Sequence, residues 1–572
     1  MTAPAESIAA VPDPDAWKLF VFRKNRAELS TYQLVKDLAA DLRSVSSRCE
    51  SIIDALVRAG EIETGVADSG WAETGEIAAI VDEIASAACA NDPYFSPAAI
   101  LHRLEQIILP ATIHCSHPEG FSYYGLHPLD FADLARRVLP ELAPVVAVIG
   151  IRTAGSTLSA VVSAVLRAHK IEVERTTVRP EGEPYLRRAR FSDSQLQWIQ
   201  ERLRQSADFV IVDEGPGFSG STFLSVASAL GDAGVPNSRT LLLCSRPLNE
   251  AAAGAAQAAS WAQYRSYAIE YGTRTPHDAA IYVGSGLWRE RLYTSQSHWP
   301  ACWTQMERSK HLSADGRCLL KFEGFGRYGR LANDQAVALA QEGLAPALAG
   351  FENGYARYEL VKGSPLARQD VSAGLLSRIA SYCAFRAKNF PTANTNSQML
   401  SNMMEVNTGV EFGESSTCKD IPVELPVYPD GRMMPHEWLV TAEGRVIKTD
   451  AVGHAEGHQL PGPADIAWDL AGAVIEWQLT ADGTEFLLNE YRRLSGDDPR
   501  RRMQCYLVLY CVHRMAHCRM GAAAMATWPE ARYLFREYQG YARQFKVTAR
   551  RIEFTRTSHY DRQPTNSQSV EG

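Results

Sequence analysis

The chain has 572 residues, of which 46% are hydrophobic and 22% charged, which is typical of a globular protein with roughly two to four domains. Its net charge of −8 argues against a broad nucleic-acid surface, and no apolar run is long enough to span a membrane. Eleven cysteines without paired spacing, and polar residues over 1–16 in place of a signal peptide, predict a cytoplasmic protein with free thiols.

The first predicted elements are helices. Apolar residues recur at three-and-four spacing across 25–110, so residues 1–118 are expected to form a helical region for capping or interaction. His114, Cys115 and His117 follow closely. A metal site would need a further ligand at recognisable spacing, and none is nearby, so these three are interpreted as loop residues.

A buried strand and a tight turn come next. Residues 145–149 carry no polar side chain, as expected of a central parallel strand, and 158–168 have a helical pattern. Arg152 lies in the turn between them, and its planar guanidinium suits a diphosphate. A plain strand-to-helix turn explains this segment equally well.

A polar, basic segment at 176–199 separates this turn from the next strand. It holds Gly, Pro and three arginines, Arg187, Arg188 and Arg190. One interpretation is an ordinary exposed hairpin, and the other, a loop that closes on an anionic ligand, is implied by the family resemblance given below.

The chain is organised around residues 207–223, ADFVIVDEGPGFSGSTF. An apolar strand ends in Asp213 and Glu214, and a loop of glycines and small hydroxyl residues leads into a helical pattern. Backbone N–H groups at such a helix start can hold a phosphate, and paired acids at a strand tip can bind a ribose diol or hydrated Mg²⁺. The alternative is a plain turn between a strand and a helix.

This segment resembles the signature of the type I phosphoribosyltransferases, in which two acids precede a loop that cups the 5′-phosphate of phosphoribosyl pyrophosphate (PRPP). The resemblance covers about residues 120–250, although the loop is one residue longer than usual and contains Gly-Pro-Gly. Strands alternating with helices there predict a doubly wound parallel sheet, within a domain at 119–255.

The resemblance also implies ligands and site residues. The ligands would be Mg²⁺ and PRPP, with Asp213, Glu214 and Arg152 as catalytic residues and Asp213 also at the metal. Further contacts to PRPP would come from two strand-to-helix loops and the basic segment: Thr153, Gly155, Ser156, Arg188, Gly217, Ser219, Gly220, Ser221 and Thr222.

A second domain is expected after a linker at 256–300. Residues 316–330 predict a strand containing Lys321, and a helix and two more strands follow. This order resembles the small lobe of aminoglycoside phosphotransferase and protein-kinase-like folds, here at 301–366.

In the resembled lobe the strand lysine holds the phosphates of ATP, so Lys321 is predicted to do so. Asp334, beside Gln335, is the nearest candidate for the acid that pairs with this lysine. Glu359 begins the expected hinge that faces adenine.

Residues 367–556 resemble the large lobe of the same folds, an α+β lobe. A predicted two-strand hairpin at 438–449 precedes Asp450, which falls at the position of the Mg²⁺ ligand. The stretch DIAWDLA follows at 465–471, and the resemblance implies that Asp469 braces the catalytic loop.

The catalytic loop departs from the family pattern. Either Asp430 is the catalytic base, or Arg432 occupies its place and no base is present. His436 or Glu437 would replace the usual Asn as a metal ligand. Alternatively, His454 and His458, together with Asp450 and His436, would form a transition-metal site.

The first functional hypothesis is a Mg²⁺-dependent, PRPP-binding phosphoribosyltransferase-like protein with a fused ATP-binding kinase-like domain, acting on a small molecule or nucleotide. The alternative is a nucleotide-sensing regulator without turnover in one or both domains. A weaker third hypothesis makes the C-terminal half a metal-dependent hydrolase. The resembled transferases are often homodimers, which makes a dimer an expectation, and residues 557–572 are predicted to be disordered.

Overall fold

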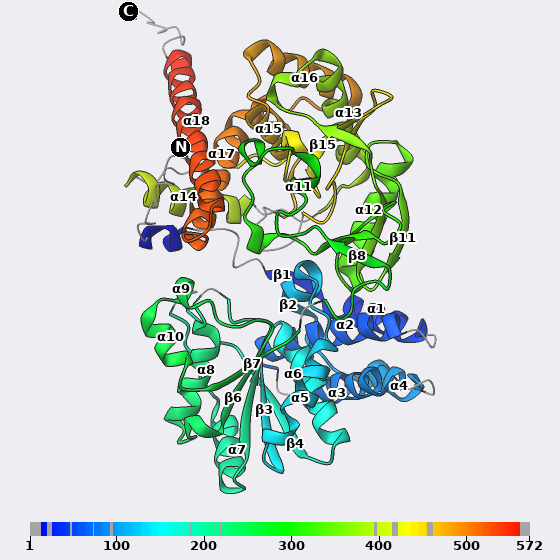
Figure 1. The fold of residues 1–572 in the computed structure, drawn as a ribbon, viewed down its shortest axis with the longest axis vertical. Coiled ribbons are helices and arrows are strands. Elements are labelled where there is room, and N and C mark those ends of the chain that lie inside the picture. The colour runs from blue at the N-terminus through cyan, green and yellow to red at the C-terminus, as the bar shows by residue number, and fades with distance from the viewer. Residues whose placement is uncertain are drawn as a thin grey trace, which may run out of the picture.

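The computed structural model describes residues 13–19, 26–45, 49–71, 74–91, 95–182, 186–217, 219–270, 272–393, 397–413, 421–454 and 462–560. One part is built on a parallel sheet and the other on an antiparallel sheet followed by a helical lobe (Figure 1). We call residues 279–560 the kinase-like half.

A five-stranded parallel sheet forms the centre of the first part, in the order β4-β3-β5-β6-β7. Its strands are β3 (Val145–Ile151), β4 (Glu172–Val178), β5 (Asp208–Val212), β6 (Thr240–Cys244) and β7 (Arg265–Ala268). The chain adds β4 on one side of β3 and the later strands on the other side. The predicted doubly wound parallel sheet is therefore confirmed, and its switch point lies between β3 and β5.

Helices cover both faces of this sheet, which explains why β5 carries only buried residues. On one face, Val146 and Val148 share a core with the helices of residues 31–138 and with α6 (Ala154–Ala168). On the other face, Ala147 and Ile149 share a core with α7 (Asp193–Arg204) and α8 (Ser221–Asp232).

The N-terminal helices belong to this core. They are α1 (Thr31–Arg43), α2 (Cys49–Asp68), α3 (Thr74–Ala90), α4 (Ala98–Gln106) and α5 (Asp130–Val138). In Figure 1 the blue helices α1 to α4 lie beside the sheet, and α2 and α3 both contact α6. The hydrophobic core therefore runs across residue 118 without a break.

A short antiparallel pair, β1 (Arg26–Ser30) with β2 (Thr112–Ser116), corrects one sequence interpretation. His114 and Cys115 lie on strand β2, not in a loop. Their side chains alternate between an exposed and a buried position, so they point away from each other. Among the described residues, no group of three or more His, Cys, Asp or Glu is placed to hold a metal ion.

The small lobe of the kinase-like half is an antiparallel sheet in the order β11-β12-β10-β9-β8. Its elements are β8 (Ala279–Tyr282), β9 (Lys310–Ser313), β10 (Cys318–Phe322), α12 (Gly326–Gln341), β11 (Leu348–Glu352) and β12 (Tyr355–Glu359). The predicted order of lysine strand, helix and two strands is confirmed. Because β8 falls inside the expected linker, the sheet begins earlier than residue 301.

The large lobe is mostly helical and has its own core. Its helices are α13 (Ala373–Asn389), α14 (Ser397–Phe412), α15 (Ala467–Glu476), α16 (Ala481–Ser495), α17 (Arg500–Ala524) and α18 (Glu530–Tyr560). Its short strands are β13 (Gly363–Pro365), β14 (Pro426–Val427), β15 (Trp438–Thr441), β16 (Val446–Lys448) and β17 (Ala464–Asp465). The expected hairpin is β15 with β16. Helix α18 continues to Tyr560, and residues 561–572 lie outside the described part, so the disorder expected over 557–572 stays a prediction.

Direct hydrogen bonds join the two parts. The Gly326 N–H donates to Asp54 at 2.7 Å, and the Phe325 N–H donates to the carbonyl of Phe121 at 2.9 Å. None of the helices described is both long and apolar enough to cross a bilayer. Nine of the cysteines in the described residues, from Cys89 to Cys518, are free thiols.

Close packing of α2 on α6 predicts a stability effect at Gly60. A Cβ at this position would lie 1.9 Å from the hydroxyl oxygen of Thr157, so we expect Gly60→Ala to destabilise the protein by about 1–3 kcal/mol. Thermal unfolding followed by circular dichroism measures this. Gly231→Ala, on α8 with nothing within 4 Å, is the control and should be neutral or stabilising by up to about 1 kcal/mol. Equal melting temperatures for both variants would contradict the proposed contact.

Candidate functional site

The switch point brings two of the predicted loops together. Residues 150–156 follow β3 and residues 213–222 follow β5, and β3 pairs directly with β5. A Cβ on Gly155 would lie 2.6 Å from the carbonyl oxygen of Val212, so only glycine allows this approach. The crevice at the carboxyl ends of such strands is where doubly wound sheets bind ligands.

Asp213 and Glu214 stand side by side at this edge, and each is partly buried. One Glu214 oxygen accepts a 2.8 Å hydrogen bond from the Gly120 N–H. Burial raises the pKa of Asp213 to about 7 and that of Glu214 to about 8, and the neighbouring Asp213 charge adds to the second shift. Among the described residues, no lysine or arginine forms an ion pair with either acid. Within the described part of the chain, the pair is therefore a carboxylate site without a directly contacting counter-ion.

A cavity of about 650 Å³ opens in front of the two acids, a volume within the range of small-molecule sites. Its walls come from three parts of the chain: the sheet edge, the segment 119–130 and the small lobe. Representative lining residues are Asp213, Glu214, Gly217, Arg246, Tyr282 and Tyr355. The small lobe thus closes a site that begins on the parallel sheet.

Most of the predicted phosphate loop does not line this cavity. Ser219 and Ser221 are buried, and a Cβ on Gly220 would lie 3.0 Å from Leu248 and 3.1 Å from Trp261. The Gly220 N–H already donates to the carbonyl of Pro216. Of the residues predicted here only Gly217 lines the cavity, and Thr222 is half-buried elsewhere. The phosphate role of Ser219–Thr222 stays a prediction.

The loop after β3 is engaged by helix α2. Arg152 contacts Asp68 at 3.1 Å and the carbonyl of Ala67 at 3.2 Å, so its guanidinium is bound inside the protein, away from the cavity. Arg179 contacts the same Asp68 at 2.6 Å and donates to the hydroxyl of Thr153. The diphosphate role of Arg152 stays a prediction.

The other two residues predicted in this loop are enclosed as well. Gly155 and Ser156 are buried, and the Ser156 hydroxyl lies 2.8 Å from that of Thr64 on α2. Thr153 has a φ of 118°, a strained value for a residue with a side chain. Residues of helix α2 therefore contact the loop in which the sequence predicted a diphosphate site.

The basic segment is a hairpin. Glu181 and Arg188 exchange two backbone hydrogen bonds of 2.8 Å, and Arg188 and Arg190 are exposed. Arg187 donates to the carbonyl of Gly182. The described residues of this segment thus follow the exposed-hairpin interpretation, and none of these arginines lines the cavity.

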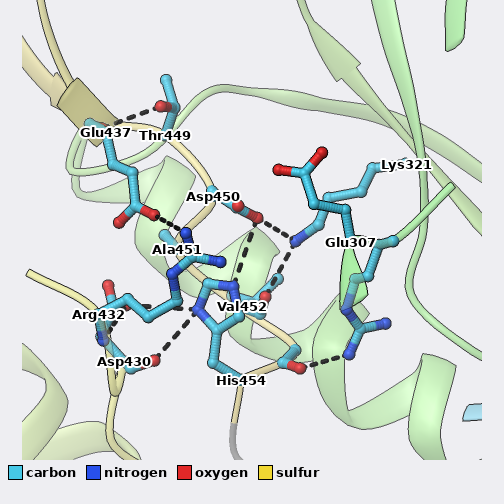
Figure 2. Close-up of polar contacts among 12 residues, drawn as sticks. Glu307, Lys321, Asp430, Arg432, Glu437, Thr449, Asp450, Ala451, Val452 and His454 are labelled. Atoms are coloured by element: carbon cyan, nitrogen blue, oxygen red, sulfur yellow. Dashed lines mark hydrogen bonds and ion pairs between the residues drawn. The ribbon is translucent and has the colours of Figure 1, made fainter. Parts of the chain in front are cut away.

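A second site is built around Lys321 on β10, shown in Figure 2. Its Nζ lies 2.5 Å from Asp450, 2.9 Å from Glu323 and 3.1 Å from the carbonyl of Val452. The structure therefore brings Lys321 and Asp450 together, as the resemblance implied. The predicted partner Asp334 is exposed on α12, and Glu323 takes its role because it follows directly on the lysine strand.

Protein cations occupy the surroundings of Asp450. Lys310 lies 3.4 Å from its second oxygen, and His454 lies 3.5 Å from the first. Burial alone would raise the pKa of Asp450, but Lys310 and Lys321 hold it well below its usual range. A Mg²⁺ ion at this acid would stand between two ammonium groups, so the residues present do not fit the metal.

Nor does the alternative transition-metal set assemble. His436 stacks on Trp288, with ring centroids 5.4 Å apart and an interplanar angle of 15°. His454 points its Nδ1 at the carbonyl oxygen of Asp430, and His458 lies outside the described residues.

Asp430 is fully buried. The Tyr382 hydroxyl donates to it at 2.5 Å, and Lys448 lies 3.1 Å away. Asp469 accepts the backbone N–H groups of Asp430 at 2.8 Å and Gly431 at 2.9 Å, which confirms its predicted role as the brace of this loop.

Arg432 follows Asp430 and Gly431, whose backbone Asp469 holds, and it lines a small cavity. It pairs with Glu437 at 2.9 Å, and Lys448 holds the other Glu437 oxygen at 3.0 Å. Of the two alternatives for the catalytic loop, the geometry favours Arg432 in the place of the base. Glu437, proposed as a metal ligand, is neutralised by the chain itself. Glu359 ends β12 with an exposed side chain.

The buried charges of this cluster balance. Its cations are Arg308, Lys310, Lys321, Arg386, Arg432 and Lys448, and its carboxylates are Glu307, Glu323, Asp430, Glu437, Asp450 and Asp469. Sequence reasoning missed several of these. A lysine inside the apolar strand before Asp450 was a usable signal for Lys448, whereas nothing marked Lys310.

Comparison with known proteins gives weak similarities only. No protein-family model matches the sequence, and no curated protein matches it. A choline kinase from Streptococcus pneumoniae has a TM-score of 0.28 and 13% identity, over 42% of this chain and 89% of that chain. A Plasmodium vivax ethanolamine kinase has a TM-score of 0.29 and 11% identity, over 42% and 80%.

A macrolide 2′-phosphotransferase from Brachybacterium faecium has a TM-score of 0.27 and 17% identity, over 41% of this chain and 87% of that chain. At such scores the description of residues 279–560 as kinase-like depends on their own strand order and on the contacts of Lys321, Asp450 and Asp469.

The raised pKa values of Asp213 and Glu214 predict a pH dependence of stability. Between about pH 4 and pH 8 the unfolded chain has released protons that the folded acids still hold, so their contribution to stability falls as pH rises. We expect the neutral double variant Asp213→Asn, Glu214→Gln to melt at a higher temperature than the parent at pH 8. At pH 5 this gain should be smaller. A gain that is the same at both pH values would contradict the unpaired state of the acids.

The contacts of Lys448 predict a large loss of stability when this residue is substituted. Lys448→Met would leave Asp430 and Glu437 buried with fewer partners, and we expect a loss of about 3–5 kcal/mol in urea unfolding followed by tryptophan fluorescence. Arg493→Met removes an exposed pair with Glu490 and should change stability by less than about 1 kcal/mol. Similar midpoints for the two variants would argue against a tightly coupled cluster.

Proposed function

We propose that this protein binds a Mg²⁺-complexed phosphoribosyl compound, PRPP or a nucleotide, at Asp213 and Glu214, and that its kinase-like half does not transfer phosphoryl groups. The observation that carries the proposal is the unpaired acid pair at a switch point, facing a cavity of about 650 Å³. The protein would then act as a sensor of that ligand.

The donor set at the sheet edge fits such a ligand. Carboxylates accept hydrogen bonds from vicinal hydroxyl groups, and Mg²⁺ commonly binds one or two protein carboxylates together with phosphates of the ligand. When bound, Mg²⁺ would neutralise the ligand phosphates beside the acids. Asp213 and Glu214 would orient the ribose, and a bound cation or hydroxyl donor would hold both of them ionised at neutral pH.

Binding without turnover is supported by the arginines that could bind a diphosphate, because most of them are already paired within the protein. Arg152 is engaged by Asp68, and Arg274 in the cavity wall is paired with Asp130 and Asp133. Arg246 is the remaining arginine among the described lining residues, and it is exposed. One exposed arginine is a poor substitute for a preorganised set that would stabilise departing pyrophosphate.

Absence of phosphoryl transfer is supported by the charges at the catalytic loop. Arg432 occupies the place of the base and cannot accept a proton at neutral pH. Asp450 is already compensated by Lys310 and Lys321. Both changes weaken the positioning and charge neutralisation on which such transfer depends.

ATP-dependent phosphotransfer is the second candidate function. The Asp469 brace and the presence of a lysine on β10 favour it, because the resembled phosphotransferases have both features. Incubation with Mg²⁺–ATP and candidate acceptors, with ADP measured by mass, decides between the two candidates. Steady ADP formation that is lost in Lys321→Met would establish this second function.

The proposed ligand site is tested by calorimetric titration with PRPP in the presence of Mg²⁺. We expect saturable binding to the parent protein and a loss of about 100-fold or more in Asp213→Asn, Glu214→Gln, because two charged hydrogen-bond acceptors are removed. Asp193→Asn, Glu201→Gln, two exposed acids on α7, is the matched control and should bind as the parent does. Unchanged affinity in the first variant would rule out the site, and pyrophosphate release by the parent would show a transferase.

A further inference from the structure

A second and smaller cavity lies beside the catalytic loop of the kinase-like half. It has a volume of about 60 Å³, which is room for about four water molecules. Arg432 and His436 reach it from the catalytic loop, and His513, Arg514 and His517 reach it from α17. A nucleotide does not fit this space, whereas a tetrahedral oxyanion does.

Two arginines line this cavity, and each contacts a carboxylate that does not line it. Arg432 pairs with Glu437 at 2.9 Å, and the Arg514 Nε lies 3.5 Å from Glu476. Like charges that line the same small cavity repel each other, and an anion bound there would relieve that repulsion.

Burial and the same positive charges lower the pKa values of the histidines that line the cavity. Burial and the positive charges of Arg432, Lys448 and Arg514 lower the pKa of His436 to about 4. Burial and Arg514 lower the pKa of His513 to about 3, and they also lower that of His517. These imidazoles are therefore neutral, and each carries one ring N–H that can donate to an anion.

The hydrogen-bonding groups of His517 and Glu307 indicate what kind of ligand the cavity could bind. The Nδ1 atom of His517 is buried and makes no hydrogen bond within the described part of the chain. Glu307 is the single carboxylate among the described lining residues, and both of its oxygens are already used, by the Gly286 N–H at 2.7 Å and the Trp288 indole N–H at 2.9 Å. The wall that remains for a ligand is positively charged and rich in hydrogen-bond donors.

We propose that this cavity is a binding site for a small tetrahedral oxyanion of the phosphate class. Arg432 and Arg514 supply the charge, and His436 and His517 supply neutral hydrogen-bond donors. In this proposal Arg432, a cation at the position expected for a catalytic base, attracts the bound anion. This site is separate from the one proposed at Asp213 and Glu214.

The test is calorimetric titration of the full chain with inorganic phosphate at pH 7, with chloride held at matched ionic strength. We expect one saturable site per chain and an affinity lowered about tenfold or more in Arg432→Gln, since one charged hydrogen bond is lost. Arg445→Gln, an exposed arginine in the turn between β15 and β16 of the same lobe, removes equal charge and should leave the affinity unchanged. Equal weakening by both variants would overturn the proposal.

Two more variants keep the outcome decisive. His517→Phe retains the bulk of the ring and removes its nitrogens, so it should also weaken phosphate binding even if Arg432→Gln folds poorly. Asp213→Asn, Glu214→Gln should keep the phosphate site whether or not the PRPP proposal holds. If the parent protein binds no phosphate, or if His517→Phe binds it as tightly as the parent, the site does not exist.

Discussion

The contact between Lys321 and Asp450 is the interaction on which the kinase-like half depends. It joins the β-sheet of the small lobe to the segment after β16 of the large lobe at 2.5 Å, with little exposure of either side chain. Buried charges are tolerated only when partners and hydrogen bonds compensate their lost hydration. The ion pairs around this contact extend from Arg308 and Glu323 in the small lobe to Lys448 and Asp430 in the large lobe.

The connection between β8 and β9, residues 283–309, links this cluster to the parallel sheet. Met306 and Glu307 line both the large cavity at the sheet edge and the small cavity beside Arg432. In the same connection Trp288 stacks on His436 of the catalytic loop. A ligand in either cavity would therefore contact a segment that also forms the wall of the other, which gives the two sites a shared physical element.

Local pattern was enough to predict the elements but not which charges meet. The parallel sheet, the lysine strand and the β15–β16 hairpin follow from short segments with strong periodicity, whereas the Asp469 brace was implied by the family resemblance of residues 465–471. The partner of Arg152 did not, because Asp68 lies on a helix 84 residues earlier and a pairing between distant segments leaves no local signal. Lys310 was missed for the same reason, since a lysine on an exposed-looking strand carries no mark of its distant acid.

The three predicted sites differ in whether such distant residues compensate their charges. At the loop after β3, the protein supplies Asp68 to the arginines that were expected to hold a diphosphate. At Asp450, it supplies Lys310 and Lys321 where a metal ion was expected. At Asp213 and Glu214 the described residues supply no counter-ion, and burial leaves the two acids with raised pKa values in front of an open cavity. The charged groups of the first two sites are thus compensated by other residues of the chain. Asp213 and Glu214 are not compensated in this way within the described residues, which is why we propose that a ligand binds there.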